Sequence, residues 1–130
     1  CRITEFTFVP DSGGAGTHRG GLAYRRRYEL LQDALVIRRY DRAKYPPSGV
    51  AGGANGRASR FVLVDADGTE HEMPSSGRYE LKAGTGFYLE QAGGGGYGDP
   101  AKRDAALIER DLAEGYVTRE AAARDYGDKV

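Results

Sequence analysis

Apolar and polar residues alternate along several short stretches of this chain. In residues 22–31 the apolar side chains fall on one face and the charged ones on the other, and only Arg26 breaks the apolar side. Alternation with a period of two is typical of a half-buried strand in an antiparallel sheet. Residues 34–40 are also rich in strand-forming residues, and we expect them to form the hairpin partner of this strand through Gln32-Asp33.

Further stretches rich in β-branched and aromatic residues predict more strands, separated by turn residues. Residues 60–64 form a continuous apolar strand that we expect to be buried on both faces, and Asp67-Gly68 predicts a hairpin after it. The other predicted strands are residues 2–9, 69–73, 78–82 and 86–91. About seven short strands with frequent turns indicate a mainly β fold, an antiparallel sandwich- or barrel-like unit.

The pattern becomes helical near the C-terminus. Asp104 is placed to cap a helix over residues 105–114, and Gly115 suits the left-handed position that follows a helix. Thr118 is placed to cap a second helix that ends at Gly127. Both helices are short and need a surface to dock on. The side chains expected to face inward are Ala105, Ile108, Leu112, Ala121, Ala122 and Tyr126.

Glycine is the outlier of the composition. It supplies 20 of 130 residues, about twice its usual share of roughly 7%. Gly93–Gly96 stand in a row, and a folded chain keeps such a run where the backbone needs a positive φ or approaches another group closely. We interpret residues 93–100 as a hinge between a glycine-rich β unit over residues 1–100 and a helical tail over residues 101–130, packed on it as one domain.

Charge and cysteine content limit the classes of function. The 19 basic and 19 acidic residues balance, so no net field attracts nucleic acid or a membrane surface. Apolar runs stay short of the roughly 20 residues that span a bilayer. Cys1 is the only cysteine, which excludes an internal disulfide and favours a cytoplasmic setting. Because Cys1 opens a strand pattern in mid-course, we expect a piece of a longer protein; an N-terminal cysteine nucleophile is the alternative.

The sequence motifs alone do not predict an active site. The spacing Gly93-x-Gly95-x-x-Gly98 matches the dinucleotide fingerprint in letters, but Asp99-Pro100 follows where that fingerprint requires a helix. His18 is isolated from other metal-ligating residues. Asp65, Asp67 and His71 could meet around the predicted hairpin, where a solvated rim is the favoured interpretation and a metal site the alternative.

Two further groups of polar residues remain. Ser12 and His18 share one loop, but Ser12 is better placed to serve a turn with Asp11 than to act as a nucleophile. A basic cluster could contact phosphate or an acidic partner, although pairing with local carboxylates is the favoured interpretation. Its members are the arginines at positions 25, 26, 27, 38, 39 and 42.

Four blocks of sequence resemble the C-terminal part of the hydantoinase B/oxoprolinase family. They are PDSGGAGTHRGGL at residues 10–22, YPPSGVAGG at 45–53, GGGGYGDP at 93–100, and the spaced residues of the tail over 103–127. The blocks stand in the family's order and at its spacing. Departures occur at Ala23, Ala92, Gly84-Thr85 and the last four residues, and they concern local turns.

The resemblance implies that this chain is the last quarter or so of a B-type subunit. Members of the family hydrolyse cyclic amides such as hydantoins or 5-oxoproline, driven by ATP, together with an A-type ATP-binding subunit; related members carboxylate ketones such as acetone or acetophenone. The resemblance implies ATP and a divalent metal for the whole complex, with the metal ligands upstream of this segment. We therefore expect this segment to bind neither ATP nor a metal ion. We also expect the chain alone to have no activity.

The resemblance and the glycine runs together suggest a site hypothesis. Backbone N–H groups of glycine loops can hold an oxyanion or a phosphate. We expect two runs to line the substrate cavity or a subunit interface, with Arg19 as the charged member, while tight structural turns at close backbone crossings are the alternative. The residues concerned are Ser12, Gly13, Gly14, Gly16, Arg19, Gly20, Gly21, Gly93, Gly94, Gly95, Gly96, Tyr97 and Asp99. A module that serves only assembly is the competing function.

Overall fold

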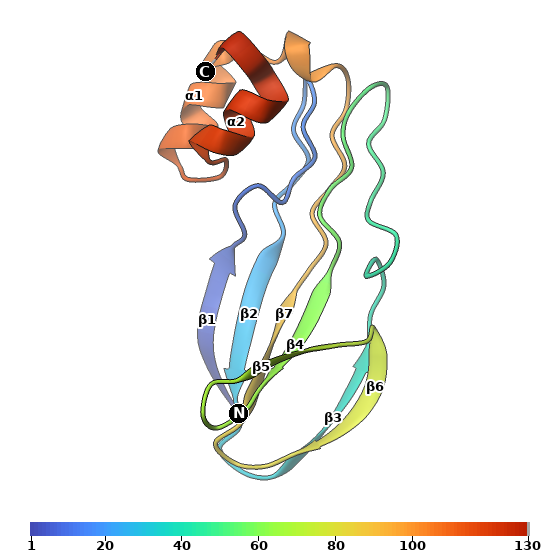
Figure 1. Cartoon of the computed structure of the whole chain (residues 1–130), viewed down its shortest axis with the longest axis vertical. Coiled ribbons are helices and arrows are strands. Elements are labelled where there is room, and N and C mark those ends of the chain that lie inside the picture. The colour runs from blue at the N-terminus through green and yellow to red at the C-terminus, as the bar shows by residue number, and fades with distance from the viewer. Residues whose placement is uncertain (130) are drawn as a thin grey trace.

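A five-stranded antiparallel sheet forms one end of the molecule in the computed structural model, which describes residues 1–129 (Figure 1). The last residue of the predicted tail, Val130, lies outside the described residues. Across the sheet the strands follow the order β1 (Arg2–Phe8), β2 (Tyr24–Glu29), β7 (Gly86–Glu90), β4 (Arg60–Val64) and β5 (Glu70–Met73). The predicted strand positions are thus confirmed to within a few residues.

The two faces of this sheet differ in chemistry. The register places Arg25 and Arg60 opposite Glu90 from its two neighbouring strands, so these three side chains share one face. On the other face the ring of Phe61 contacts that of Phe87, with centroids 5.5 Å apart. Phe61 is fully buried, as expected for the continuous apolar strand β4.

The Asp67-Gly68 hairpin is confirmed between β4 and β5. Gly68 adopts φ +89°, a left-handed conformation that favours glycine, and its N–H donates to the Asp65 carbonyl (2.9 Å). The Asp65 N–H donates to the Thr69 carbonyl (2.9 Å) and closes the turn.

A separate two-stranded arm consists of β3 (Ala34–Arg39) and β6 (Ser76–Leu81). The predicted hairpin between β2 and β3 is therefore wrong. Strand β2 already has β1 on one edge and β7 on the other, which leaves no edge for β3. The Leu30 N–H donates to the Thr85 carbonyl (2.8 Å), and the chain leaves the main sheet there. The Tyr79 ring contacts Phe61 of β4 (centroids 5.8 Å apart), so the arm packs against the main sheet.

Two short helices form the opposite end of the molecule (Figure 1). Asp104 caps α1 (Ala105–Ala113) by accepting from the Ala106 N–H, and Thr118 caps α2 (Arg119–Tyr126) by accepting from the Ala121 N–H. Gly115 follows α1 with φ +70°. Two single-turn 3-10 helices complete this end, η1 (Pro100–Lys102) and η2 (Gly127–Lys129). The caps predicted from the sequence are confirmed.

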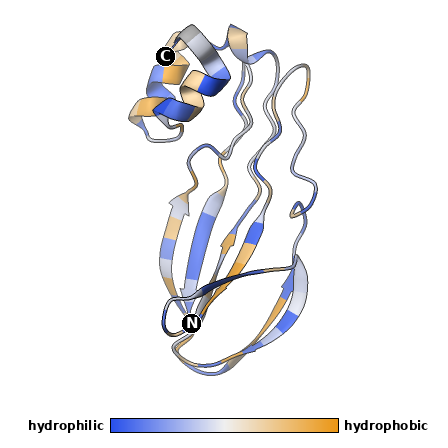
Figure 2. Cartoon of the chain, in the orientation of Figure 1, coloured by the Kyte–Doolittle hydropathy of each residue, from blue (hydrophilic) through white to orange (hydrophobic). Residues whose placement is uncertain are grey.

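The helices bury a small core of their own. Ile108 and Ala122 pack there with Ala15, which comes from the first glycine-rich loop. Val117, Ala121 and Tyr126 complete the cluster. The mainly β fold with two C-terminal helices is confirmed. Extended glycine-rich segments run between the sheet and the helices, and Figure 2 colours them near white because glycine has intermediate hydropathy.

Within the described part of the chain, no helix combines the length and the apolarity needed to cross a membrane.

Candidate functional site

Three glycine-rich segments lie side by side between the sheet and the helices. We call residues 11–21, 47–57 and 92–98 the glycine bundle. The Gly14 N–H donates to the Gly94 carbonyl (2.8 Å), and the Gly96 N–H donates to the Ala54 carbonyl (2.8 Å). Residues 92–98 lead from β7 to η1, which is the place of the predicted hinge. They are also hydrogen-bonded to both of the other segments.

Close backbone approach explains the glycines at 93–96. A Cβ built on Gly95 would lie 2.0 Å from the Ser48 carbonyl oxygen, and one on Gly96 would lie 2.1 Å from that of Ala15. The positive φ values occur at other glycines, among them Gly52 and Gly98. Of the two reasons for a glycine run that the sequence leaves open, the structure shows close approach at these positions.

The bundle uses its own backbone N–H groups. The Gly93 N–H donates to the Arg57 carbonyl (2.9 Å) and the Gly94 N–H to the Gly21 carbonyl (2.8 Å). In the first loop the Gly20 N–H donates to the Gly14 carbonyl (2.9 Å). An N–H that already donates to a carbonyl is not free to hold an oxyanion. These particular amides therefore serve the fold.

Ser12 also has a structural environment. Its hydroxyl donates to the Val9 carbonyl (2.5 Å) and accepts from the Ala23 N–H (2.7 Å). The side chain is buried, as expected for a residue that serves a turn rather than a nucleophile. The bond to Ala23 occurs at one of the positions where the chain departs from the family pattern.

Arg19 is part of a buried ion cluster with Asp111 and Arg103. Its Nε donates to Asp111 Oδ2 (2.9 Å) and its Nη2 to Asp111 Oδ1 (3.2 Å). Arg103 Nη2 donates to Asp111 Oδ2 (2.6 Å). Burial alone would raise the pKa of Asp111, but the hydrogen bonds from the two arginines hold the pKa of this carboxyl below its usual range. The cluster ties α1 to the glycine bundle.

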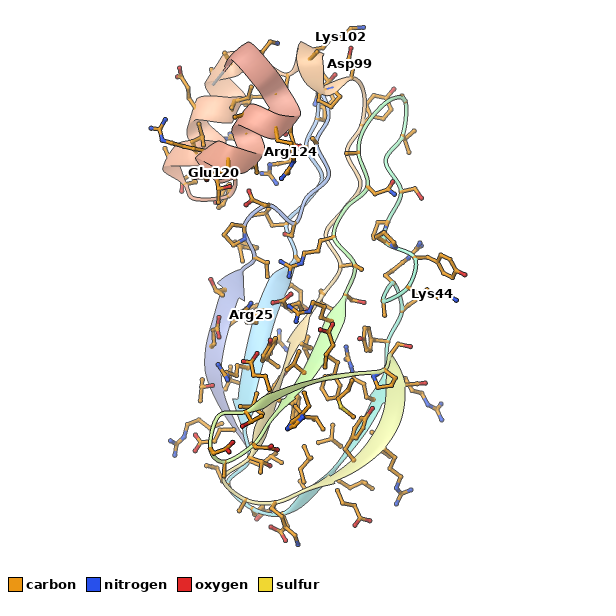
Figure 3. The ribbon with its side chains drawn as sticks, viewed as in Figure 1. Arg25, Lys44, Asp99, Lys102, Glu120 and Arg124 are labelled. Atoms are coloured by element: carbon orange, nitrogen blue, oxygen red, sulfur yellow. The ribbon has the colours of Figure 1, made fainter. Side chains whose placement is uncertain are left out.

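Tyr97 and Asp99 lie at the helical end of the bundle. Tyr97 is 58% exposed, and it forms isolated bridges with His18 and with Val50, which is 59% exposed. Asp99 caps η1 by accepting from the Ala101 N–H (2.9 Å), and Figure 3 labels it beside Lys102. Of the predicted site residues, Tyr97 offers a large exposed side chain to a ligand or partner.

A second charged cluster, which the sequence did not indicate, surrounds Glu90. Its carboxylate accepts from Arg25 Nε (2.9 Å) and lies 3.3 Å from Arg57 Nη2. Arg60 Nη1 lies 3.7 Å away. Glu90 is 1% exposed, and Figure 3 shows Arg25 where the sheet meets the bundle. Arg57 comes from the bundle, so this cluster joins the bundle to the sheet.

The predicted acidic and histidine group at the hairpin behaves as a solvated rim. His71 Nε2 lies 2.7 Å from Asp65 Oδ2, and both side chains are about half exposed. Asp67 instead accepts from the Thr69 N–H (2.9 Å). Within residues 1–129 no three His, Cys, Asp or Glu side chains are grouped so that they could hold a metal ion. The described residues therefore do not fit a metal centre.

The surface is hollowed beside the helices. A hollow of about 650 Å³ is lined by Pro10, Leu112, Val117, Arg119, Lys129 and neighbouring residues. It lies at the helical end rather than over Gly93–Gly96.

Comparison with known proteins identifies related sequences. A model of the hydantoinase B/oxoprolinase family matches residues 1–100. An uncharacterized protein of Methanocaldococcus jannaschii is 38% identical over 98% of this chain. The caprolactamase subunit beta of Pseudomonas jessenii is 30% identical over 96% of it. The chain spans 23% and 22% of the lengths of these two relatives.

Two solved structures resemble this chain in three dimensions. The ATP-dependent caprolactamase from Pseudomonas jessenii superposes with a TM-score of 0.83 at 27% identity, over 96% of this chain and 22% of that chain. A nucleotide-free acetone carboxylase superposes with a TM-score of 0.61 at 17% identity, over 96% of this chain and 21% of that chain. The second likeness shows the fold alone.

Proposed function

Because the chain belongs to the hydantoinase B/oxoprolinase family, we propose that it is the C-terminal segment of a B-type subunit of an ATP-dependent cyclic-amide hydrolase. The observation that carries the proposal is the likeness to the caprolactamase chain, which extends over both the sheet and the helices. The segment shapes the active site or the subunit interface and is not active alone. Its partners are the rest of the B-type subunit and an A-type ATP-binding subunit, in the cytoplasm.

The geometry supports a scaffolding role within that enzyme. The bundle is held backbone to backbone, and charged clusters around Asp111 and Glu90 fix it to the helices and to the sheet. A segment held in this way keeps the sheet and the helices in a fixed relative position. ATP and a divalent metal would be held by other parts of the complex. Exposed Tyr97 and Val50 are the bundle residues that we propose line the cavity or the interface.

The test is a reconstituted complex. A B-type subunit that contains this chain is purified with its A-type subunit, and ATP-dependent hydrolysis of hydantoin, 5-oxoproline and caprolactam is measured. We expect turnover of at least one cyclic amide, and loss of turnover when ATP is omitted. Tyr97→Ala should change kcat or KM while leaving the complex assembled, with Tyr45→Ala, a comparably exposed tyrosine, as the control.

Two results would redirect the proposal. Bicarbonate-dependent consumption of acetone or acetophenone without amide hydrolysis would assign the chain to a ketone carboxylase, the alternative that the acetone carboxylase fold resembles. Full activity of a complex lacking this segment would contradict the proposal, because the segment would then be needed for neither catalysis nor assembly.

The isolated chain provides a separate prediction. The chain of 130 residues should show no ATP-dependent hydrolysis of these amides, because its described residues hold no metal-ligand group and its glycine amides are engaged in the fold. Hydrolysis above the rate of a heat-denatured sample would contradict this.

A further inference from the structure

The arginines that form one basic cluster in the sequence are divided among β2, β3 and, for Arg42, the loop after β3. On β2 two of the three arginines meet carboxylates: Arg25 contacts Glu90, and Arg27 Nη2 lies 3.6 Å from Glu70. Pairing with carboxylates is therefore confirmed for Arg25 and Arg27, whereas Arg26 Nη1 donates to the Tyr28 hydroxyl (3.3 Å). On β3, which belongs to the arm, the arginines have different surroundings.

The end of the arm carries an excess of positive charge. We call Arg38, Arg39, Arg42, Lys44 and Arg78 the arm-tip cations. Among residues 1–129, none of the five has a carboxylate oxygen within 4.0 Å of its charged nitrogens. The acidic residues beside them are Asp41 and Glu80, and Asp41 Oδ1 accepts from the Arg42 N–H (2.7 Å). The chain as a whole has zero formal net charge, so this excess is local.

A hollow lies among these cations. It has a volume of about 350 Å³ and is lined by residues 37–39 of β3 and 76–78 of β6. Ile37 pairs with Arg78 and Arg39 pairs with Ser76, so Arg39 and Arg78 are diagonal neighbours on one exposed face. Like charges placed this close repel each other unless an opposite charge lies between them.

Arg38 adds a half-buried positive charge on the other face of the arm. Its guanidinium carbon lies 3.6 Å from the centroid of the Tyr40 ring and 4.9 Å from that of Phe61. Its Nε and Nη2 atoms are buried and make no hydrogen bond to any described residue. Burial lowers the pKa of the Arg38 guanidinium, which nonetheless stays charged.

Apolar side chains share the exposed face with Arg39 and Arg78. Leu35 is 44% exposed and Ile37 is 61% exposed. Apolar residues interspersed with arginine are typical of protein interfaces, whereas nucleic-acid surfaces depend on broad basic patches that meet phosphates. The positive charge also requires an acidic occupant for complementarity.

We propose that the arm docks an acidic segment of a partner protein, whose carboxylates bind Arg39 and Arg78 and whose apolar side chains cover Leu35 and Ile37. This inference concerns an interaction surface and does not depend on which reaction the enzyme performs.

The test uses a defined peptide probe. A fluorescent acetylated peptide that alternates glutamate and valine over six residues is titrated with a B-type subunit that contains this chain, and binding is followed by fluorescence anisotropy. We expect saturable binding that weakens with added salt. The double variant Arg39→Glu with Arg78→Glu should weaken it by about tenfold or more, and should gain binding to the matching lysine–valine peptide. An unchanged circular dichroism spectrum shows that the variant is folded.

A matched control carries the same change of charge elsewhere. Lys102 and Arg119 are exposed cations at the helical end, and Figure 3 shows Lys102 there, away from Lys44. Lys102→Glu with Arg119→Glu should leave peptide binding unchanged. The proposal is overturned if the peptide does not bind at about 1 mM, or if the two double variants lose binding equally. Tighter binding of a DNA duplex than of the peptide would overturn it in favour of a nucleic-acid surface.

Discussion

Gly95 lies where two segments of the bundle cross with their backbones in contact. Its missing side chain leaves room for the Ser48 carbonyl, whose oxygen and carbon would lie 2.0 Å and 2.5 Å from a Cβ. Both are backbone atoms, so no rotamer change relieves the clash. We expect Gly95→Ala to lower the free energy of unfolding by about 1–3 kcal/mol or more, measured by urea denaturation.

Gly21 is the matched control for this substitution. A Cβ at Gly21 meets no described atom within 4 Å, and the residue is exposed. Gly21→Ala should change stability by less than about 1 kcal/mol, and in the stabilising direction if it changes at all. Equal losses in the two variants would mean that close approach is not the reason for glycine at 95.

At the scale of secondary-structure elements, Asp111 fastens α1 to the bundle. Asp111→Asn keeps the shape of the side chain but removes the charge between Arg19 and Arg103. Removing one member of a buried ion cluster leaves the others uncompensated, which costs about 3–5 kcal/mol. Asp33→Asn, in an exposed pair with Lys82, should cost less than about 1 kcal/mol. Thermal or urea unfolding of both variants measures the difference.

The effect of Asp111→Asn should depend on pH. The pKa of Asp111 is lowered in the folded state, so the stability that its carboxylate contributes is present above its unfolded pKa of about 3.9. That stability is lost as the pH falls from there through the folded pKa. The gap between the wild type and Asp111→Asn should therefore narrow below about pH 4. A gap that stays constant from pH 7 to pH 2 would show that the charge of Asp111 contributes nothing.

The elements that sequence predicts well are those whose signals are local. Asp104, Thr118 and Gly115 act within a turn of the helix they bound, and the hairpin at Gly68 is likewise formed by neighbours. The partner of β3 was mispredicted because pairing depends on which strand edges are already occupied. Residues 93–98 are glycine except at Tyr97, so they have no pattern of side chains from which the segments that they contact could be predicted.

The candidate site shows the same division between local and distant signals. Arg19 could be singled out from its loop, but its partner Asp111 lies 92 residues away in sequence. Glu90 was missed because its cluster forms only when Arg25, Arg57 and Arg60 converge from separate elements. Such convergence follows from sheet order and bundle packing, which a single sequence does not specify.

At the scale of the whole molecule, β1 presents an apolar surface without a cover among the described residues. Phe6 is 65% exposed and Phe8 is 58% exposed, and both line a hollow with Tyr24. Exposed apolar patches of this kind drive association. We expect the isolated chain to self-associate as its concentration rises, and Phe6→Thr with Phe8→Thr to abolish this, measured by sedimentation velocity. Threonine retains the preference for a strand, so β1 should persist.

Substitutions at dispersed apolar residues separate a patch effect from general hydrophobicity. Leu31 is 55% exposed and Tyr45 is 71% exposed, but they lie in different loops. Leu31→Thr with Tyr45→Thr should leave self-association unchanged, because single exposed apolar residues do not form a continuous surface. If this control suppresses association as strongly as the β1 variant, the contact does not depend on β1. We expect the same surface on β1 to contact the rest of the polypeptide in the proposed B-type subunit. That outcome would contradict this expectation as well.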